Sequence, residues 1–177
     1  MHIESLVPRG RAHCLEVVCA DVSIAEAVQD RAERTDWRCI DVDRREHAAF
    51  DGRTIQYNDG EFDVAVLCDV LHHAPRDAGR LLAEAARVAK SVIVKDHFEQ
   101  GAYSRTMLGL IDSNGDWDCP VGVPERSLTR DGFVSLAVEQ GLVITALDCG
   151  LPSRDSPPAA RGSSHVDADF IAVLRRD

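Results

Sequence analysis

Side chains able to carry out acid–base chemistry follow an unbroken apolar run in the middle of the chain. Val64 to Leu67 contain no polar residue, and Asp69, His72 and His73 come shortly after them. A carboxylate carries a negative charge and an imidazole titrates near neutral pH, so together they can take up or deliver a proton. A helix-capping aspartate beside two partly exposed histidines would read the same, so residue type alone leaves both interpretations open.

A second apolar run, Ser91 to Val94, ends in a similar group of polar residues. Such continuous runs predict parallel strands covered on both faces. Ligands of open α/β sheets bind beyond the carboxyl ends of the strands. We therefore expect an acid–base cluster at two neighbouring strand ends, made of Asp69, His72, His73, Lys95, Asp96 and His97. Two histidines and a carboxylate could hold a metal, but no H-x-x-x-H spacing supports this, and the sequence predicts no metal site.

The elements that must position these groups alternate between strand and helix patterns. The order predicts an α/β fold with a mostly parallel sheet and helices on both faces. The last two strands, joined without a helix, should pair antiparallel at one side. We expect strands at 13–18, 37–42, 64–67, 91–94, 143–147 and 170–174, a short strand near 53–57, and helices at 23–34, 77–89 and 129–139.

Local signals set the ends of these helices and the pairs on their surfaces. Ser23 and Glu26 fit a capping box, and Thr129 can cap the last helix. Gly141 suits a left-handed position after that helix. Arg80 and Glu84 stand four residues apart and could pair. Residues 152–165 are rich in Pro, Ser, Gly and Arg and predict a flexible loop.

Size and charge narrow the class of protein. The chain of 177 residues is expected to form a single domain, 1–177, in which residues 1–11 read as a tag or a flexible lead-in. The net charge of −10 gives no electrostatic route to nucleic acid or to an anionic membrane. No apolar run is long enough for a membrane span, and no C-x-x-C pair is present. We expect a soluble cytoplasmic protein with reduced cysteines.

Taken together, these stretches resemble the class I S-adenosylmethionine-dependent methyltransferases, in a bacterial small-molecule branch. Residues 62–73 look like the fourth-strand motif of that family, 84–88 look like the following helix, and 91–97 are similar to a fifth strand. The likeness covers most of residues 13–148. It implies a Rossmann-like sheet of seven strands, the last two forming an antiparallel pair, and S-adenosylmethionine as cofactor.

The resemblance also implies a role for individual residues. Glu16 matches the acidic residue that opens the cofactor motif, with Cys19 and Ala20 in the loop behind it. Asp41 matches the carboxylate that accepts hydrogen bonds from the cofactor ribose. Further matches are Asp51 at the adenine and Asp69 beside the methionine part; the proposed catalytic residues are His72, His73, His97 and Asp69.

The cofactor motif departs from the family pattern at its glycines. The family form is acidic-x-Gly-x-Gly-x-Gly, and the three glycine positions are here Val18, Ala20 and Val22. Glycine accepts positive φ and lets the backbone approach a ligand closely. A valine forced into that geometry stores about 1–3 kcal/mol of strain. If the loop relaxes instead, the valine side chains fill space that the cofactor would use.

Three functions therefore remain open. The first is methyl transfer to a small molecule, with a damaged but usable cofactor loop and a histidine as base. The second is a repurposed enzyme of the same fold that catalyses a cyclisation or rearrangement. The third is a non-catalytic relative that binds a protein partner, which the loss of the glycines would fit. The sequence names no substrate and no oligomeric state.

Overall fold

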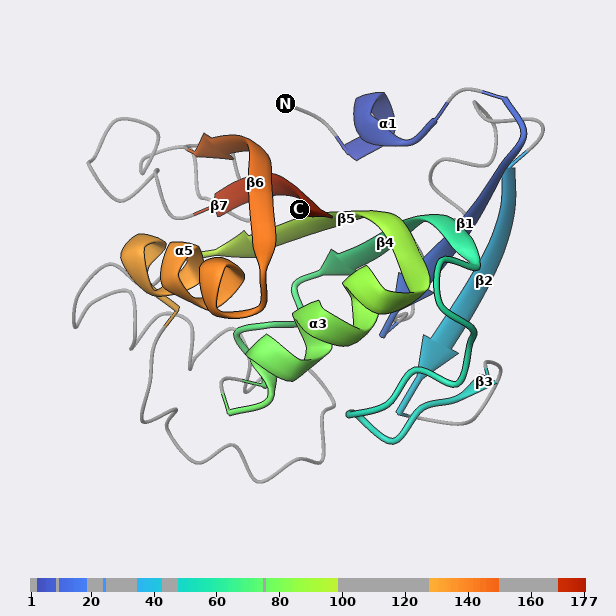
Figure 1. Cartoon of the computed structure of the whole chain (residues 1–177), viewed down its shortest axis with the longest axis horizontal. Coiled ribbons are helices and arrows are strands. Elements are labelled where there is room, and N and C mark those ends of the chain that lie inside the picture. The colour runs from blue at the N-terminus through green and yellow to red at the C-terminus, as the bar shows by residue number, and fades with distance from the viewer. Residues whose placement is uncertain are drawn as a thin grey trace, which may run out of the picture.

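A seven-stranded sheet carries the fold in the computed structural model, which describes residues 3–8, 10–18, 24, 35–42, 48–74, 76–98, 128–149 and 169–177 (Figure 1). The spatial order of the strands is β3-β2-β1-β4-β5-β7-β6. Their bounds are β1 Ala12–Val17, β2 Thr35–Asp41, β3 Ala48–Ala49, β4 Phe62–Cys68, β5 Ala89–His97, β6 Leu142–Cys149 and β7 Asp169–Arg176. The helices in the described ranges are α1 Ile3–Leu6, α3 Ala78–Val88 and α5 Arg130–Glu139.

The pairing of the strands confirms the predicted fold class. Strands β1 to β5 pair in parallel, whereas β7 pairs antiparallel with both β5 and β6. The chain order reverses between β1 and β4, which are neighbours in the sheet. In a parallel sheet, such a reversal opens a crevice at the carboxyl ends of the strands, where ligands bind.

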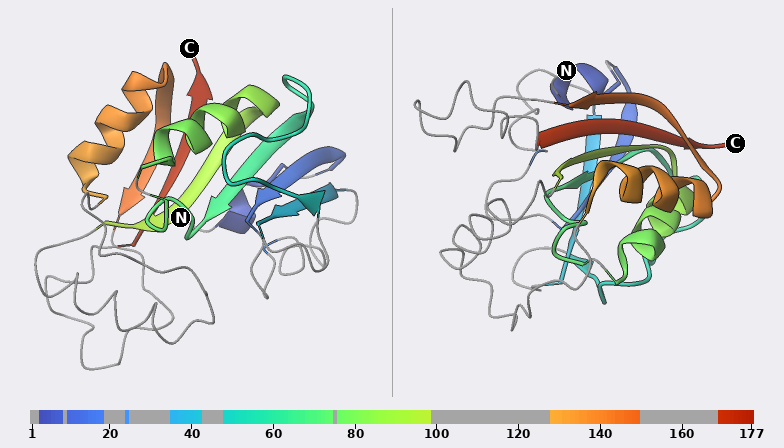
Figure 2. Two further views of the ribbon diagram at one scale, coloured as in Figure 1. Left: turned by 90° about the horizontal axis from the view of Figure 1, so that it is seen from below. Right: turned by 90° about the vertical axis from the view of Figure 1, so that its left-hand side faces the viewer.

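Helices cover one face of the sheet and the N-terminal segment covers part of the other. In Figure 2, α3 and α5 lie on the same side, and α1 lies on the opposite side. Strand β4 shows why its sequence lacks polar alternation. Phe62, Ala65 and Leu67 belong to the core under α3, while Val64 and Val66 belong to the core on the α1 side. Both faces of the strand are therefore buried.

The two later helices follow their sequence signals. Helix α3 buries the predicted apolar side, namely Leu81, Leu82, Ala85 and Val88. Thr129 caps α5 by accepting a hydrogen bond from the backbone N–H of Gly132 at 3.1 Å. Gly141, just beyond that helix, has a φ of 67°. No helix in the described ranges is both long and apolar enough to cross a membrane.

The prediction of a short strand near residues 53–57 is wrong, because side chains accept the backbone hydrogen bonds that a neighbouring strand would have formed with this segment. Arg53 and Thr54 donate their backbone N–H groups to Asp51 at 2.8 and 2.7 Å, and Ile55 donates to Glu84 at 2.9 Å. The strand that extends the sheet on this side is β3, paired with β2.

The expected pair between Arg80 and Glu84 is also replaced by other contacts. Glu84 binds Arg87 through two hydrogen bonds of 2.9 Å, and Arg80 donates to the Thr54 hydroxyl at 3.3 Å. Arg87 also donates to the carbonyl groups of Tyr57 and Ile55. The arginine three residues further along α3 therefore takes the carboxylate because it lies against the loop before β4.

Several expectations fall outside the described residues. They are the capping box of Ser23 and Glu26, most of the helix at 23–34, and the loop at 152–165. The cysteines that the structure describes, Cys14, Cys39, Cys68 and Cys149, are free thiols.

Candidate functional site

Asp69 follows β4 directly and turns the chain at the carboxyl edge of the sheet. Its backbone has a φ of 56°, a left-handed conformation that aspartate tolerates better than most residues. Its N–H donates to the carbonyl oxygen of Lys95 at 2.8 Å. Its two carboxylate oxygens accept from Lys95 Nζ at 2.8 and 2.7 Å. The ends of β4 and β5 are thus tied together by both backbone and side chain.

Asp96, near the end of β5, is the buried centre of the site. Its side chain has no exposed surface, yet both carboxylate oxygens are hydrogen-bonded. Oδ2 accepts from the backbone N–H of Leu71 at 2.9 Å and of His72 at 3.4 Å. Oδ1 accepts from the N–H of His97 at 2.8 Å and from His72 Nδ1 at 2.7 Å. These bonds fix the loop after β4 against the end of β5.

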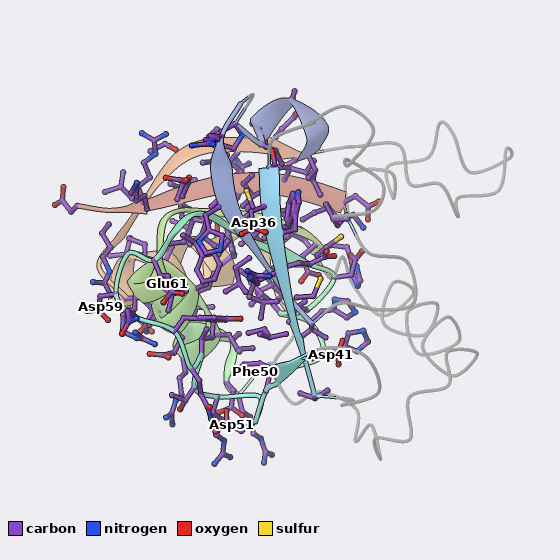
Figure 3. All side chains as sticks on the ribbon, turned by 90° about the vertical axis from the view of Figure 1, so that its right-hand side faces the viewer. Asp36, Asp41, Phe50, Asp51, Asp59 and Glu61 are labelled. Carbon is purple, nitrogen blue, oxygen red and sulfur yellow. The ribbon has the colours of Figure 1, made fainter. Side chains whose placement is uncertain are left out.

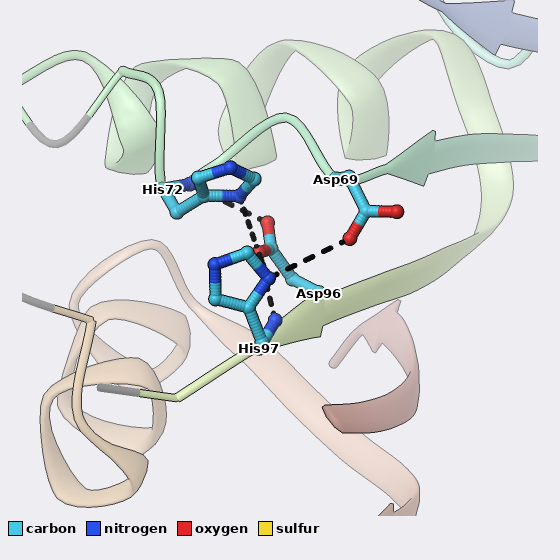
Figure 4. Close-up of side chains that lie close together, drawn as sticks. All are labelled: Asp69, His72, Asp96 and His97. Atoms are coloured by element: carbon cyan, nitrogen blue, oxygen red, sulfur yellow. Dashed lines mark hydrogen bonds and ion pairs between the residues drawn. The ribbon is translucent and has the colours of Figure 1, made fainter. Parts of the chain in front are cut away.

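Two imidazole rings complete the cluster formed by Asp69, His72, Asp96 and His97 (Figure 4). The rings of His72 and His97 lie with their centroids 4.1 Å apart. His97 Nδ1 lies 3.8 Å from Asp69 Oδ1 and 3.7 Å from Asp96 Oδ1. One nitrogen or oxygen atom from each of the four residues lies within 4.8 Å of the others. The sequence-based prediction that these strand ends meet is therefore confirmed for these four residues.

Burial and neighbouring charges shift the pKa values of this cluster in opposite directions. Burial alone would raise the pKa of Asp69, but the neighbouring His97 and the charge and hydrogen bonds of Lys95 outweigh it and hold that pKa far below its usual value. For His97, burial alone would lower the pKa, but Asp69 and Asp96 raise it above the usual histidine value. A proton on His97 is therefore stabilised between two carboxylates.

Asp41 and Glu16 lie at the ends of the two strands beside β4. Asp41 is the last residue of β2, is buried, and its carbonyl oxygen accepts from the N–H of Phe50 at 2.9 Å. Figure 3 shows it at the end of β2 opposite to Asp36. Glu16, near the end of β1, is also buried and accepts from the N–H of Ile24 at 2.8 Å. Glu16 therefore anchors Ile24 beside the end of β1.

Val18 keeps a glycine-like backbone. Its φ is 62°, and its N–H donates to the carbonyl oxygen of Ile40 at 2.8 Å. Its partly buried side chain packs against the larger core cluster. Of the two outcomes that the sequence left open, the structure adopts the first at this residue: Val18 is held in the left-handed conformation.

The remaining predicted site residues stand apart from the cluster or outside the described ranges. Asp51 is exposed, and its carboxylate holds the turn formed with Arg53 and Thr54; these two backbone hydrogen bonds lower its pKa. His73 is exposed, and its ring centroid lies 3.8 Å from that of His72. Cys19 and Ala20 lie outside the described residues.

Asp96 was expected in the acid–base cluster but was not among the four proposed catalytic residues, although it forms more hydrogen bonds within the site than any of them. The signal for its place in the cluster was its position two residues beyond the apolar run 91–94, next to Lys95. What the sequence could not show is that its carboxylate would turn back under the loop after β4.

Comparisons with known proteins agree with this fold. A family model described as a methyltransferase domain matches residues 4–92. A search of curated proteins found no match.

Solved structures with the same fold extend over nearly the whole chain. A S-adenosylmethionine-dependent methyltransferase from Methanosarcina mazei has a TM-score of 0.68 at 13% identity, covering 99% of this chain and 97% of the other. One from Mesorhizobium loti has a TM-score of 0.66 at 12% identity, with coverages of 98% and 95%. One from Aquifex aeolicus has a TM-score of 0.63 at 12% identity, with coverages of 97% and 86%. At these identities the likeness shows the fold.

Proposed function

Because this chain belongs to the family of methyltransferase domains, we propose that it binds S-adenosylmethionine and transfers the methyl group to a small-molecule acceptor. The observation that carries the proposal is the placement of three acidic residues at one edge of the sheet. Glu16, Asp41 and Asp69 stand at or next to the carboxyl ends of β1, β2 and β4, which are adjacent strands. The histidine–carboxylate cluster lies at the same edge.

The residues at this edge fit the cofactor in charge and in backbone shape. Asp41 would accept hydrogen bonds from the two ribose hydroxyls, a task for which a carboxylate offers paired acceptors. Glu16 would act indirectly, because its carboxylate already holds the N–H of Ile24. Val18 has the left-handed backbone conformation that a glycine would adopt at this position. Asp51, Cys19 and Ala20 remain proposed contacts.

When bound, S-adenosylmethionine supplies an electrophilic methyl group on a positively charged sulfur. The residues of this chain would orient the acceptor and take up its proton. Asp96 holds His72 through Nδ1 at 2.7 Å. If Nδ1 carries the shared hydrogen, Nε2 is left as the proton acceptor, and the buried carboxylate stabilises the imidazolium that forms.

A binding experiment tests the proposal without knowledge of the acceptor. Calorimetric titration of the full chain with S-adenosylmethionine and S-adenosylhomocysteine should show micromolar dissociation constants. An absence of binding heat at millimolar ligand would refute the proposal. The triple change V18G/A20G/V22G should tighten binding, because it removes three side chains from the turn.

Val18 also favours a second candidate. A valine side chain at a position where the family places glycine is what a relative that has given up methyl transfer would carry, either as a repurposed enzyme or as a binding protein. The triple variant separates the two. If the natural chain shows no binding and the triple variant binds, the second candidate is supported and the loop is the cause.

A further inference from the structure

We propose that the cluster of Asp69, His72, Asp96 and His97 is a binding site for one divalent transition-metal ion of the zinc class. The four residues come from the ends of two neighbouring strands, and one ligand atom from each lies within 4.8 Å of the other three. Two imidazoles and two carboxylates are a donor set that zinc and cobalt accept and that magnesium, which prefers all-oxygen sites, does not.

The hydrogen bonds around the carboxylates are of the kind that support metal ligands. In metal sites, the coordinating carboxylates are themselves hydrogen-bonded by outer groups that orient them. Asp96 Oδ2 accepts from two backbone N–H groups, which leaves Oδ1 directed at His72 and His97. Asp69 is oriented in the same way by Lys95. A carboxylate has about four lone-pair sites. In Asp96 three of them accept from the backbone N–H groups of Leu71, His72 and His97, and the fourth, which now faces His72 Nδ1, is the one that an ion would take.

Charge and burial also favour a cation here. With neutral imidazoles, two carboxylates face the single charge of Lys95. Asp96 is fully buried, and the side chains of His72 and His97 are each only 13% exposed.

The ion and the shared protons of the cluster would bind to the same nitrogen and oxygen atoms, so one excludes the other. Without an ion, His72 donates to Asp96 and can serve as the base described above. With an ion, both histidines are ligands, and an oxygen or nitrogen of the acceptor would reach the ion only if its shell of four protein ligands expanded to five. This last step rests on the proposed function, whereas the site itself does not.

Metal titration of the full chain without cofactor tests the site. Zn²⁺ and Co²⁺ should bind with one ion per chain by calorimetry, and Mg²⁺ should not compete. Changing His72 or His97 to Ala should weaken Zn²⁺ binding at least about tenfold. His73→Ala is the matched control, because His73 is the neighbouring histidine but lies outside the cluster. The Zn²⁺ affinity of this variant should match that of the natural chain.

Two further measurements identify the ligands and guard against variants that fail to fold. Bound Co²⁺ should show weak d–d absorption without the intense sulfur-to-cobalt band that a cysteine site would give. If the histidine variants do not fold, Asp69→Asn provides the same test, because asparagine tolerates the left-handed backbone at this position.

Absence of Zn²⁺ and Co²⁺ binding, or binding unchanged in the His72 and His97 variants, would overturn the proposal. Titration of the same variants with S-adenosylhomocysteine reports on the cofactor separately, so the two proposals can fail independently.

Discussion

Val18 permits a test of stored strain, because glycine and alanine should there reverse their usual order of stability. At an ordinary position, glycine is about 0.5–1 kcal/mol less stable than alanine. The φ of 62° at Val18 costs a residue with a Cβ atom about 1–2 kcal/mol, and glycine does not pay this cost.

The expected magnitudes follow from the packing of the side chain. Val18 is partly buried against the core, so loss of its two methyl groups costs about 1 kcal/mol in either variant. Val18→Ala keeps the Cβ atom and its strain, so its free energy of unfolding should fall by about 1 kcal/mol. Val18→Gly should regain the strain energy, offset in part by backbone entropy. We expect it to be more stable than the alanine variant by about 0.5–1 kcal/mol.

Urea unfolding of the two variants measures this difference. Val42 provides a matched control, because it also follows a strand but has no positive φ. There the glycine variant should be the less stable of the pair. A glycine variant at Val18 that is less stable than the alanine variant, by the margin seen at Val42, would refute a left-handed turn at this residue.

Three other predictions concern groups outside the turn. Glu84→Gln should lower the free energy of unfolding by about 2 kcal/mol at neutral pH in urea unfolding, because Glu84 accepts from Arg87 twice and from Ile55. The hydrogen bond with Arg87 lowers the pKa of Glu84 in the folded protein, so the loss of stability in the glutamine variant should be complete above the ordinary glutamate pKa and should vanish as the pH falls through the lowered pKa of the folded state. A loss of stability that does not change with pH would contradict this. In peptide mapping after alkylation at pH 8, Cys149, which is exposed, should react, whereas Cys14 should not, because burial raises its pKa to about 12; equal labelling of the two would contradict the buried position.

The fold was predictable because the strands that carry it are read from continuous apolar runs. Val64 to Leu67 show this most directly: residues of β4 are buried alternately on both faces. The short strand expected near residues 53–57 was wrong because Asp51 and Glu84 take the backbone N–H groups of that segment. Contacts between a loop and a distant helix leave no periodic signal in the sequence.

The location of the candidate site was predictable from the sequence, whereas the hydrogen bonds between its side chains were less so. Parallel strands bring their carboxyl ends to one edge, so the meeting of Asp69, His72 and His97 follows from topology. The central position of Asp96 does not follow from topology, because it depends on the path of the loop after β4. The backbone of Val18 was left open in the sequence for a related reason: strain and relaxation are alternatives that only the surrounding hydrogen bonds decide.

The affinity of S-adenosylhomocysteine for the natural chain and for two single variants tests the central claim most directly. Asp41→Asn removes the carboxylate proposed for the ribose, and Asp36→Asn makes the same change at the opposite end of the same strand (Figure 3). Charge-assisted hydrogen bonds contribute about 1.5–3 kcal/mol, which corresponds to a loss of about tenfold to 100-fold in affinity. We expect that loss in the Asp41 variant and none in the Asp36 variant. Equal affinities in all three proteins, or no binding in any, would contradict a cofactor site at the carboxyl ends of these strands.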